Sequence, residues 1–293
     1  MKVLLTGASG FVGGAVGRRA RELNWDVLAL GRRRLSHAGY RSIDLSQPFD
    51  LDFQPDVVIH AAARSSPWGT CRDFESQCVD TTRHVLEFCA RRGHPHFIHI
   101  STAAVLYRDE HQLALDEQTL FPAHPINEYA RAKTRSEQLV RDYSGPGCIL
   151  RPRAVFGPED TVVFPRILRA LERRRLPLFA SDQPVLADLI YIDTLADCIA
   201  RAARQHATGV YHLSQAEPAA TSRSPPPPPA SGPGFPPRIL LRATTNKSTT
   251  FTNGSTANVI PRSTPTTPRT FSAPPSPPAF LKSTVSVPAP AAI

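Results

Sequence analysis

A glycine-rich turn near the start of the chain narrows the possible folds more than any other segment. In LTGASGFVGG the glycines have the spacing Gly7-x-x-Gly10-x-x-Gly13, between an apolar run and a stretch of helical spacing. Gly7 permits a tight turn, Gly10 lets the backbone approach a pyrophosphate, and Gly13 lets the helix pack closely on the strand. The helix N-terminus offers N–H groups and a partial positive charge to the same anion. Between a strand and a helix this turn predicts a dinucleotide-binding site, whereas elsewhere it indicates only a flexible loop. The cofactor-binding residues expected here are Gly7, Ser9, Gly10, Phe11, Val12 and Gly13.

The first 217 residues alternate short apolar runs with longer stretches of helical spacing. Strands are expected at 2–7, 26–31, 56–63, 96–102 and 147–157, the last running into a loop, and helices at 11–24, 76–93 and 129–143. Such alternation implies βαβ units and a parallel sheet. The near-continuous apolar strands suit a sheet that is covered on both faces. The expected fold class is therefore α/β, a Rossmann-type doubly wound parallel sheet with helices on both faces.

The composition changes at about residue 218. Residues 218–293 hold 18 of the 30 prolines and seven Lys or Arg, without any Asp or Glu. Few large apolar residues leave too little burial to offset the entropy of ordering, so this tail is expected to be disordered. It also explains the net charge of +9, because residues 1–217 carry 27 basic against 25 acidic side chains. The high pI of 9.7 therefore does not indicate a nucleic-acid partner.

Other features favour a cytoplasmic protein. A strand expected from residue 2 leaves no room for a signal peptide ahead of it, and no apolar window is long enough for a membrane span. The five cysteines are odd in number, scattered and without C-x-x-C, which is typical of reduced thiols. The histidines lack ligand spacing, so no metal site is expected.

The end of the second expected strand bears on the choice of cofactor. LALGRRR has no acidic residue there to hold the adenosine ribose hydroxyls, as NAD sites commonly have. Arg32 and Arg33 stand where a 2′-phosphate would lie, which favours NADP, with NAD possible; a solvated basic loop is the alternative. Asp44 and Leu45 are placed to reach the adenine, or else form a simple turn.

Several segments in order resemble the extended short-chain dehydrogenase/reductase family, within the NAD-dependent epimerase/dehydratase superfamily. They are TGASGFVGG, IDLS, VVIHAAA, ISTAAV, YARAK, RPRAVFGP and LIYIDTLADCI, and they span residues 1 to about 217. HAAARSSPWG and DLIYIDTLADCIARAA look most like the 3β-hydroxysteroid dehydrogenase-like branch, which includes bacterial reductases of β-keto or β-hydroxy compounds. The resemblance implies a nucleotide-binding domain over 1–217, with a substrate lobe starting at about 152, and a homodimer through helices at 74–92 and 129–143.

The resemblance gives a role to the segment NEYARAK, whose spacing alone is also common on surface helices. Tyr129 would be the acid/base, with Lys133 one helical turn on. An unperturbed Tyr has a pKa of about 10, which Lys133 and an oxidised nicotinamide would lower. Tyr129 and Lys133 are also expected to bind the cofactor, Lys133 by holding the nicotinamide ribose. Thr102 would supply the hydroxyl that orients the carbonyl, with Ser101 as the alternative.

The resemblance also implies a cofactor bed. Ala61, Ala62 and Ala63 would line it, a role compatible with plain core packing, and Pro152 and Val155 would approach the nicotinamide.

Five further residues have open or structural interpretations. Trp68 faces a hydrophobic substrate or packs in its loop, and Arg151 and Arg153 steer an anionic group or are structural. Asn127 and Glu128 are expected to start a helix.

Some positions depart from the family pattern. Cys78 stands where Asn is frequent and Thr81 where Gly is common. Ala154 and Ala187 replace the Asn and Arg of sugar-nucleotide enzymes, which weakens an epimerase or dehydratase assignment. After GVYHLSQAEPAATS the expected helices of the substrate lobe give way to the proline-rich tail, which suggests a frameshift or, alternatively, a genuine Pro-rich ligand segment.

Three hypotheses follow. The first is an NAD(P)-dependent oxidoreductase that moves a hydride between the nicotinamide and a hydroxyl or ketone carbon of a hydrophobic, 3β-hydroxysteroid-like or β-keto substrate. The second is a sugar-nucleotide epimerase or dehydratase, and the third is a non-catalytic dinucleotide-binding remnant. For the family role, the first is preferred.

Overall fold

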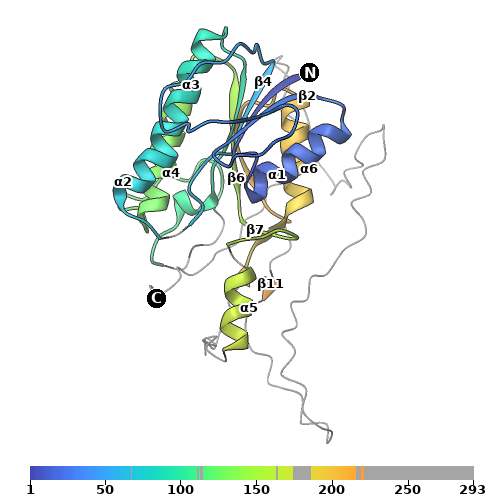
Figure 1. Cartoon of the computed structure of the whole chain (residues 1–293). Helices are drawn as coiled ribbons and strands as arrows, with labels where there is room; N and C mark the ends of the chain where they lie inside the picture. Colours follow the sequence, from blue (N-terminus) through green and yellow to red (C-terminus); the bar gives the residue numbers. More distant parts are fainter. Residues whose placement is uncertain are drawn as a thin grey trace, which may run out of the picture.

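A seven-stranded sheet forms the centre of the molecule (Figure 1). The computed structural model describes residues 1–215, except 67, 111, 113–114, 163 and 174–185, together with 219–220. The disordered tail expected over 218–293 therefore lies outside the described residues, apart from that last pair.

The strand order confirms the expected fold class. The sheet runs β10-β6-β5-β4-β1-β2-β3, and all neighbours are parallel. The order reverses between β1 and β4, and ligands bind doubly wound sheets outside the carboxyl ends of the strands at such a point. The strands are β1 Lys2–Thr6, β2 Asp26–Gly31, β3 Tyr40–Ser42, β4 Val57–His60, β5 His96–Ile100, β6 Gly147–Pro152 and β10 Gly209–Leu213.

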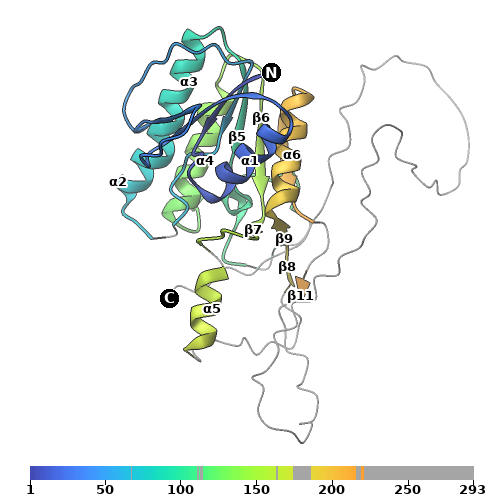
Figure 2. The same cartoon turned by 45° about the vertical axis from the view of Figure 1, so that its right-hand side comes forward.

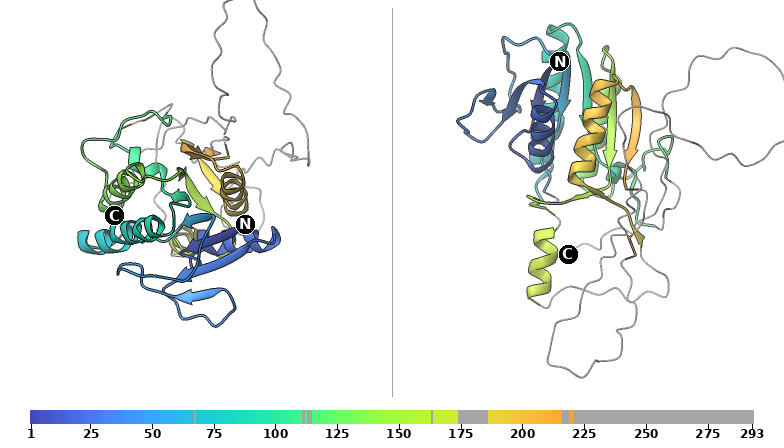
Figure 3. Two further views of the ribbon diagram at one scale, coloured as in Figure 1. Left: turned by 90° about the horizontal axis from the view of Figure 1, so that it is seen from above. Right: turned by 90° about the vertical axis from the view of Figure 1, so that its right-hand side faces the viewer.

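Helices cover both faces of this sheet. The helices α1 Phe11–Glu22 and α6 Ile192–Arg204 pack together on one face. The opposite face carries α3 Thr81–Arg91 and α4 Glu128–Arg141, preceded by α2 Cys71–Phe74 and the π-helix η1 Glu75–Asp80. Figure 3 shows the two helical layers on either side of the strands.

Smaller elements lie at the carboxyl ends of the strands. They are the 3₁₀ helix η2 Ala103–Leu106, the pair β7 Ala154–Phe156 and β9 Leu189–Tyr191, the pair β8 Leu186–Ala187 and β11 Ala219–Ala220, and helix α5 Phe164–Glu172. Figure 2 shows α5 standing beyond this end of the sheet.

The core explains why the strands read as continuous apolar runs. Alternate residues of β1 enter two clusters, with Val3 and Leu5 toward α1 and α6 and Leu4 toward α3 and α4. Both sets are fully buried, since side chains alternate across a strand and both faces are covered.

The elements α5, α6, β8, β9, β11 and η2 lie where the sequence predicted no helix or strand, and three further differences concern predicted segments and the sheet. The helix expected over 76–93 begins earlier, at Cys71, and contains the π-turn η1; its end is set by Gly93 at φ +75°. The run 147–157 divides into β6 and β7, because the Arg153 N–H bonds Leu213 O of β10 at 2.9 Å and β7 then joins β9. The short strand β3 was not expected.

Gly13 and Gly14 provide a matched test of the packing between β1 and α1. A Cβ at Gly13 would lie 2.1 Å from Gly7 O, whereas one at Gly14 would meet nothing closer than Ala8 O at 3.7 Å. We expect Gly13→Ala to lower the free energy of unfolding by about 2 kcal/mol or more, because the main chain must move. Gly14→Ala should leave it unchanged or raise it by up to about 1 kcal/mol through helix propensity. Urea unfolding followed by circular dichroism measures both, and equal midpoints would contradict this prediction.

Candidate active site

The turn after β1 has the geometry of a phosphate cradle. Gly7 adopts φ +71°, and a Cβ there would lie 2.7 Å from the main chain of Ala61 and Ala62. The turn therefore lies directly against the chain leaving β4, at the point where the strand order reverses. Gly10 is the N-cap of α1, and its N–H bonds Gly7 O at 2.9 Å.

The first turn of α1 is suited to an anion. The first N–H to enter the helical ladder is that of Gly14, which donates to Gly10 O at 2.8 Å, so Phe11, Val12 and Gly13 stand ahead of the ladder. The turn carries no acidic side chain. Ser9 lies beside Gly31 at the end of β2, because its Oγ would be 2.8 Å from a Cβ built there. These residues fit the pyrophosphate end of a dinucleotide.

The end of β2 carries the two arginines considered for a 2′-phosphate. Arg32 and Arg33 are both exposed, and Arg32 Nη1 donates to Gln77 Oε1 of η1 at 3.0 Å. Asp44 accepts the Ser46 N–H at 3.0 Å, so its carboxylate supports its own turn. The Leu45 side chain is buried in the core, which leaves only its main chain to face a nucleotide.

The chain leaving β4 is tied to β1 by a buried histidine. His60 Nδ1 lies 2.8 Å from Thr6 Oγ1, which also accepts the Ala62 N–H at 3.2 Å. On its other side, His60 Nε2 lies 3.1 Å from Thr82 Oγ1. Burial lowers the pKa of His60 to about 3, so its ring is neutral at physiological pH. Ala61 and Ala63 are half-buried next to these groups.

The three residues expected to be catalytic meet at the carboxyl end of β5. Tyr129 and Lys133 project from successive turns of α4, which Asn127 starts by capping the Ala130 N–H at 2.8 Å. The Thr102 hydroxyl accepts the Ala104 N–H at 3.2 Å and lies near enough to the Tyr129 phenol to act on its pKa. Ser101, the alternative, is turned away and donates instead to Glu137 Oε1 at 2.6 Å. Of the two hydroxyls, Thr102 is therefore the one placed beside Tyr129.

Burial determines the protonation states of Tyr129 and Lys133. Burial, and after it Cys78, raises the pKa of the Tyr129 phenol well above its usual value, and the nearby Thr102 hydroxyl opposes that rise. Burial lowers the pKa of Lys133, whose side chain is 2% exposed. The Lys133 ammonium donates to Ile100 O at 2.6 Å and lies 3.4 Å from His99 Nε2. At neutral pH the phenol is thus a proton donor.

A buried ion pair fixes the helix that carries Tyr129 and Lys133. Arg151 of β6 donates to both carboxylate oxygens of Glu137, Nε at 2.9 Å and Nη2 at 2.7 Å, and neither side chain is more than 1% exposed. Glu137 lies one helical turn beyond Lys133 on α4. Arg151 is therefore structural, which decides one of the open interpretations.

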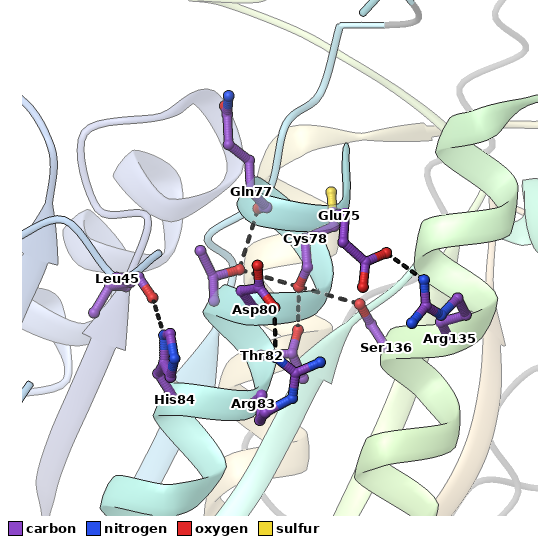
Figure 4. Close-up of polar contacts among 11 residues, drawn as sticks. Leu45, Glu75, Gln77, Cys78, Asp80, Thr82, Arg83, His84, Arg135 and Ser136 are labelled. Carbon is purple, nitrogen blue, oxygen red and sulfur yellow. Dashed lines mark hydrogen bonds and ion pairs between the residues drawn. The ribbon is translucent and has the colours of Figure 1, made fainter. Parts of the chain in front are cut away.

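The π-turn η1 ties α4 to the neighbouring helix, and sequence periodicity did not predict it. The Cys78 carbonyl accepts the hydroxyls of Thr82 at 2.7 Å, Thr81 at 3.0 Å and Ser136 of α4 at 3.2 Å (Figure 4). A π-turn frees carbonyls from the helical ladder, and such turns are frequent at functional sites. The sequence signal that could have pointed to this turn is the presence of hydroxyl side chains at 81, 82 and 136, and that signal is not specific.

The remaining expected residues border the same end of the sheet. Pro152 ends β6 beside Leu213, and Val155 of β7 packs on the core. Trp68 is 61% exposed, so it is not a packed loop aromatic. Arg153 is buried, with its Nη1 3.1 Å from the Tyr107 hydroxyl and its Nε 4.0 Å from Asp188.

Comparison with known proteins agrees with this geometry. Residues 3–214 match the model of the NAD dependent epimerase/dehydratase family. The chain belongs to this family. The family description supports a nicotinamide dinucleotide as the cofactor, in accord with the turn after β1.

Relatives within the family include named reductases and steroid dehydrogenases. The 2-alkyl-3-oxoalkanoate reductase of Stenotrophomonas maltophilia is 32% identical over 67% of this chain and 63% of its own length. An Arabidopsis thaliana 3beta-hydroxysteroid-dehydrogenase/decarboxylase, isoform 2, is 25% identical over 53% of this chain and 28% of its own. The chain thus spans less than two thirds of these relatives. Among solved structures, the Bordetella bronchiseptica enzyme WbmH in complex with NAD+ is similar to this chain, with a TM-score of 0.64 and 19% sequence identity. The match covers 75% of this chain and 77% of the WbmH chain, and it shows that the two share a fold.

Three further findings concern the described residues only. None of their helices has the length and apolar character needed to cross a bilayer. Nowhere among them do three His, Cys, Asp or Glu side chains gather so as to hold a metal ion. All five cysteines are free thiols.

The buried ion pair of α4 can be tested against an exposed pair in the same helix. Removing Glu137 leaves the Arg151 charge buried alone, so Glu137→Ala should lower the free energy of unfolding by about 3–5 kcal/mol. Glu128 pairs with Arg131 at 3.2 Å near the surface, and Glu128→Ala should cost less than about 1 kcal/mol. Urea unfolding at pH 7 measures both, and similar losses would contradict the structural role of Glu137.

Proposed function

We propose that the chain is an NADP(H)-dependent oxidoreductase that interconverts a ketone and an alcohol on a hydrophobic substrate. The observation that carries the proposal is that Thr102, Tyr129 and Lys133 come together at the carboxyl end of β5, the same end of the sheet as the turn after β1. When bound, the dinucleotide would supply or accept the hydride. The residues proposed to bind the cofactor are the individual residues expected from the sequence, of which Gly7 is the first and Val155 the last.

Tyr129 would handle the proton of the reaction. In ketone reduction its phenol gives a proton to the carbonyl oxygen, which gains the electron pair of the C=O π bond as the carbon receives a hydride. The Thr102 hydroxyl orients that oxygen by a hydrogen bond. Because burial keeps the phenol protonated, Tyr129 is in the form that donates a proton in ketone reduction. In oxidation, Lys133 and an oxidised nicotinamide would have to lower the Tyr129 pKa.

The substrate class is supported by two observations. A reductase of 2-alkyl-3-oxoalkanoates is among the relatives, and its substrate is a β-keto compound with an alkyl chain. Ala154 and Ala187 supply no polar groups to a nucleotide diphosphate, which argues against a sugar-nucleotide epimerase. By resemblance, the active form would be a homodimer through α3 and α4.

Turnover provides the test of the catalytic assignment. With NADPH and a 2-alkyl-3-oxoalkanoate, Tyr129→Phe should lower kcat at least about 100-fold while leaving NADPH affinity near that of the unaltered chain. Tyr143→Phe is the matched control, since Tyr143 follows the same helix and its hydroxyl donates to Pro95 O at 2.8 Å. Undiminished turnover in Tyr129→Phe would reject the assignment. Activity on a UDP-sugar with co-purified NAD would indicate an epimerase, and cofactor binding without any turnover would indicate a remnant.

Cofactor choice is tested at the end of β2. NADPH and NADH are titrated separately by quenching of Trp25 and Trp68 fluorescence. If Arg32 and Arg33 bind the 2′-phosphate, the double substitution to Ala should weaken NADPH about tenfold or more and leave NADH unchanged. Arg21→Ala, in the last turn of α1, is the control and should change neither. A preference for NADH in the unaltered chain would overturn the NADP assignment while leaving the fold intact.

A further inference from the structure

Lys133 places an ammonium charge in a buried position where none of its hydrogen-bond partners carries a negative charge. Its ammonium is buried, and the two protein groups bonded to it among the described residues, Ile100 O and His99 Nε2, are both neutral acceptors. An ammonium has three N–H donors. Two of them are thus held by β5, and one is left to face the cofactor or substrate.

His99 is built to accept from this ammonium. It is fully buried in β5 and stacks on His60 with ring centroids 5.5 Å apart. Because Nε2 must accept, the ring proton resides on Nδ1, which has no partner among the described groups. The charged or titratable groups acting on this pair are His60 from β4, Cys78 from η1 and Glu137 from α4. Protonating His99 would place a second cation beside Lys133, so the ring stays neutral, as its lowered pKa indicates.

His96 is a second buried histidine of β5, and its hydrogen bond is not to Lys133. Its ring is 2% exposed and its Nε2 lies 2.8 Å from Ala207 O, next to α6. His99 lies three positions after His96, an odd interval, so the two rings lie on opposite faces of β5. The two histidines share a strand, burial and an unpartnered Nδ1, but only His99 contacts the catalytic helix.

We propose that His99 is a positioning residue for Lys133. Its Nε2, with the Ile100 carbonyl, directs the remaining N–H of the ammonium toward the nicotinamide ribose. The inference rests on the proposed function, and it assigns the site a residue that does not itself touch the reacting atoms. His60 supports it from behind, since its ring is locked between Thr6 and Thr82 and stacks on His99.

A double-mutant cycle on the full chain tests the coupling between the two side chains. NADPH and NADH are titrated by tryptophan fluorescence into His99→Leu, Lys133→Met and the double variant. His99→Leu should weaken binding of the preferred cofactor about threefold to tenfold when Lys133 is present, and have no further effect in the Lys133→Met background. His99→Gln, which keeps an acceptor at similar reach, should stay within about twofold of the unaltered chain. His96→Leu, the matched control, should leave the affinity unchanged in both backgrounds.

The outcomes separate this inference from the proposed function. Thermal melts identify variants that do not fold, and His99→Met replaces His99→Leu in the cycle if needed. Equal losses with and without Lys133, or a His99→Gln variant as defective as His99→Leu, would show a merely structural histidine and overturn the inference alone. If the unaltered chain binds neither cofactor, the proposed function falls and the inference with it.

Discussion

The bidentate pair of Glu137 and Arg151 is the interaction on which the candidate site depends. Glu137 belongs to α4 and Arg151 to β6; the Ser101 hydroxyl at the end of β5 donates to the same carboxylate, and Arg141 Nη2 lies 3.6 Å from it. The buried Glu137 carboxylate thus joins α4 to β6 through Arg151 and to the end of β5 through Ser101. Burying both ions costs solvation free energy, which the paired hydrogen bonds offset only in good geometry. Such a pair therefore specifies position more than it adds stability.

A second layer of polar groups extends from this pair across the sheet. Lys133 reaches His99, His99 stacks on His60, and His60 joins the ends of β1 and β4 through Thr6. These histidines lie in strands that otherwise bury apolar side chains. Burying a polar group costs free energy unless the group is hydrogen-bonded. Since water does not reach these side chains, each one depends on the protein groups placed next to it. The turn after β1 and helix α4 are therefore connected through these buried polar groups.

The π-turn η1 also fixes the position of α4, from the helix layer rather than from the sheet. By presenting the Cys78 carbonyl to Ser136, η1 binds α4 to the helix layer that contains α3. Cys78 itself packs with Tyr129 in one buried cluster. The Cys78 side chain is therefore part of the immediate surroundings of Tyr129, while its main-chain carbonyl holds α4.

The sequence by itself determined the features that depend on neighbours in the chain. The spacing of Gly7, Gly10 and Gly13, the alternation of strands and helices, and the four-residue interval from Tyr129 to Lys133 are local, so pattern and periodicity were enough to predict them. Only the tertiary structure decided that Thr102 rather than Ser101 meets Tyr129, because the competing partner of Ser101 is Glu137, 36 residues away. The same holds for Arg151, whose role depends on α4, and for the division of 147–157, which depends on β9 and β10. Hydrogen bonds between distant segments leave no periodic trace in a single sequence, and here they determine which polar side chains form the site.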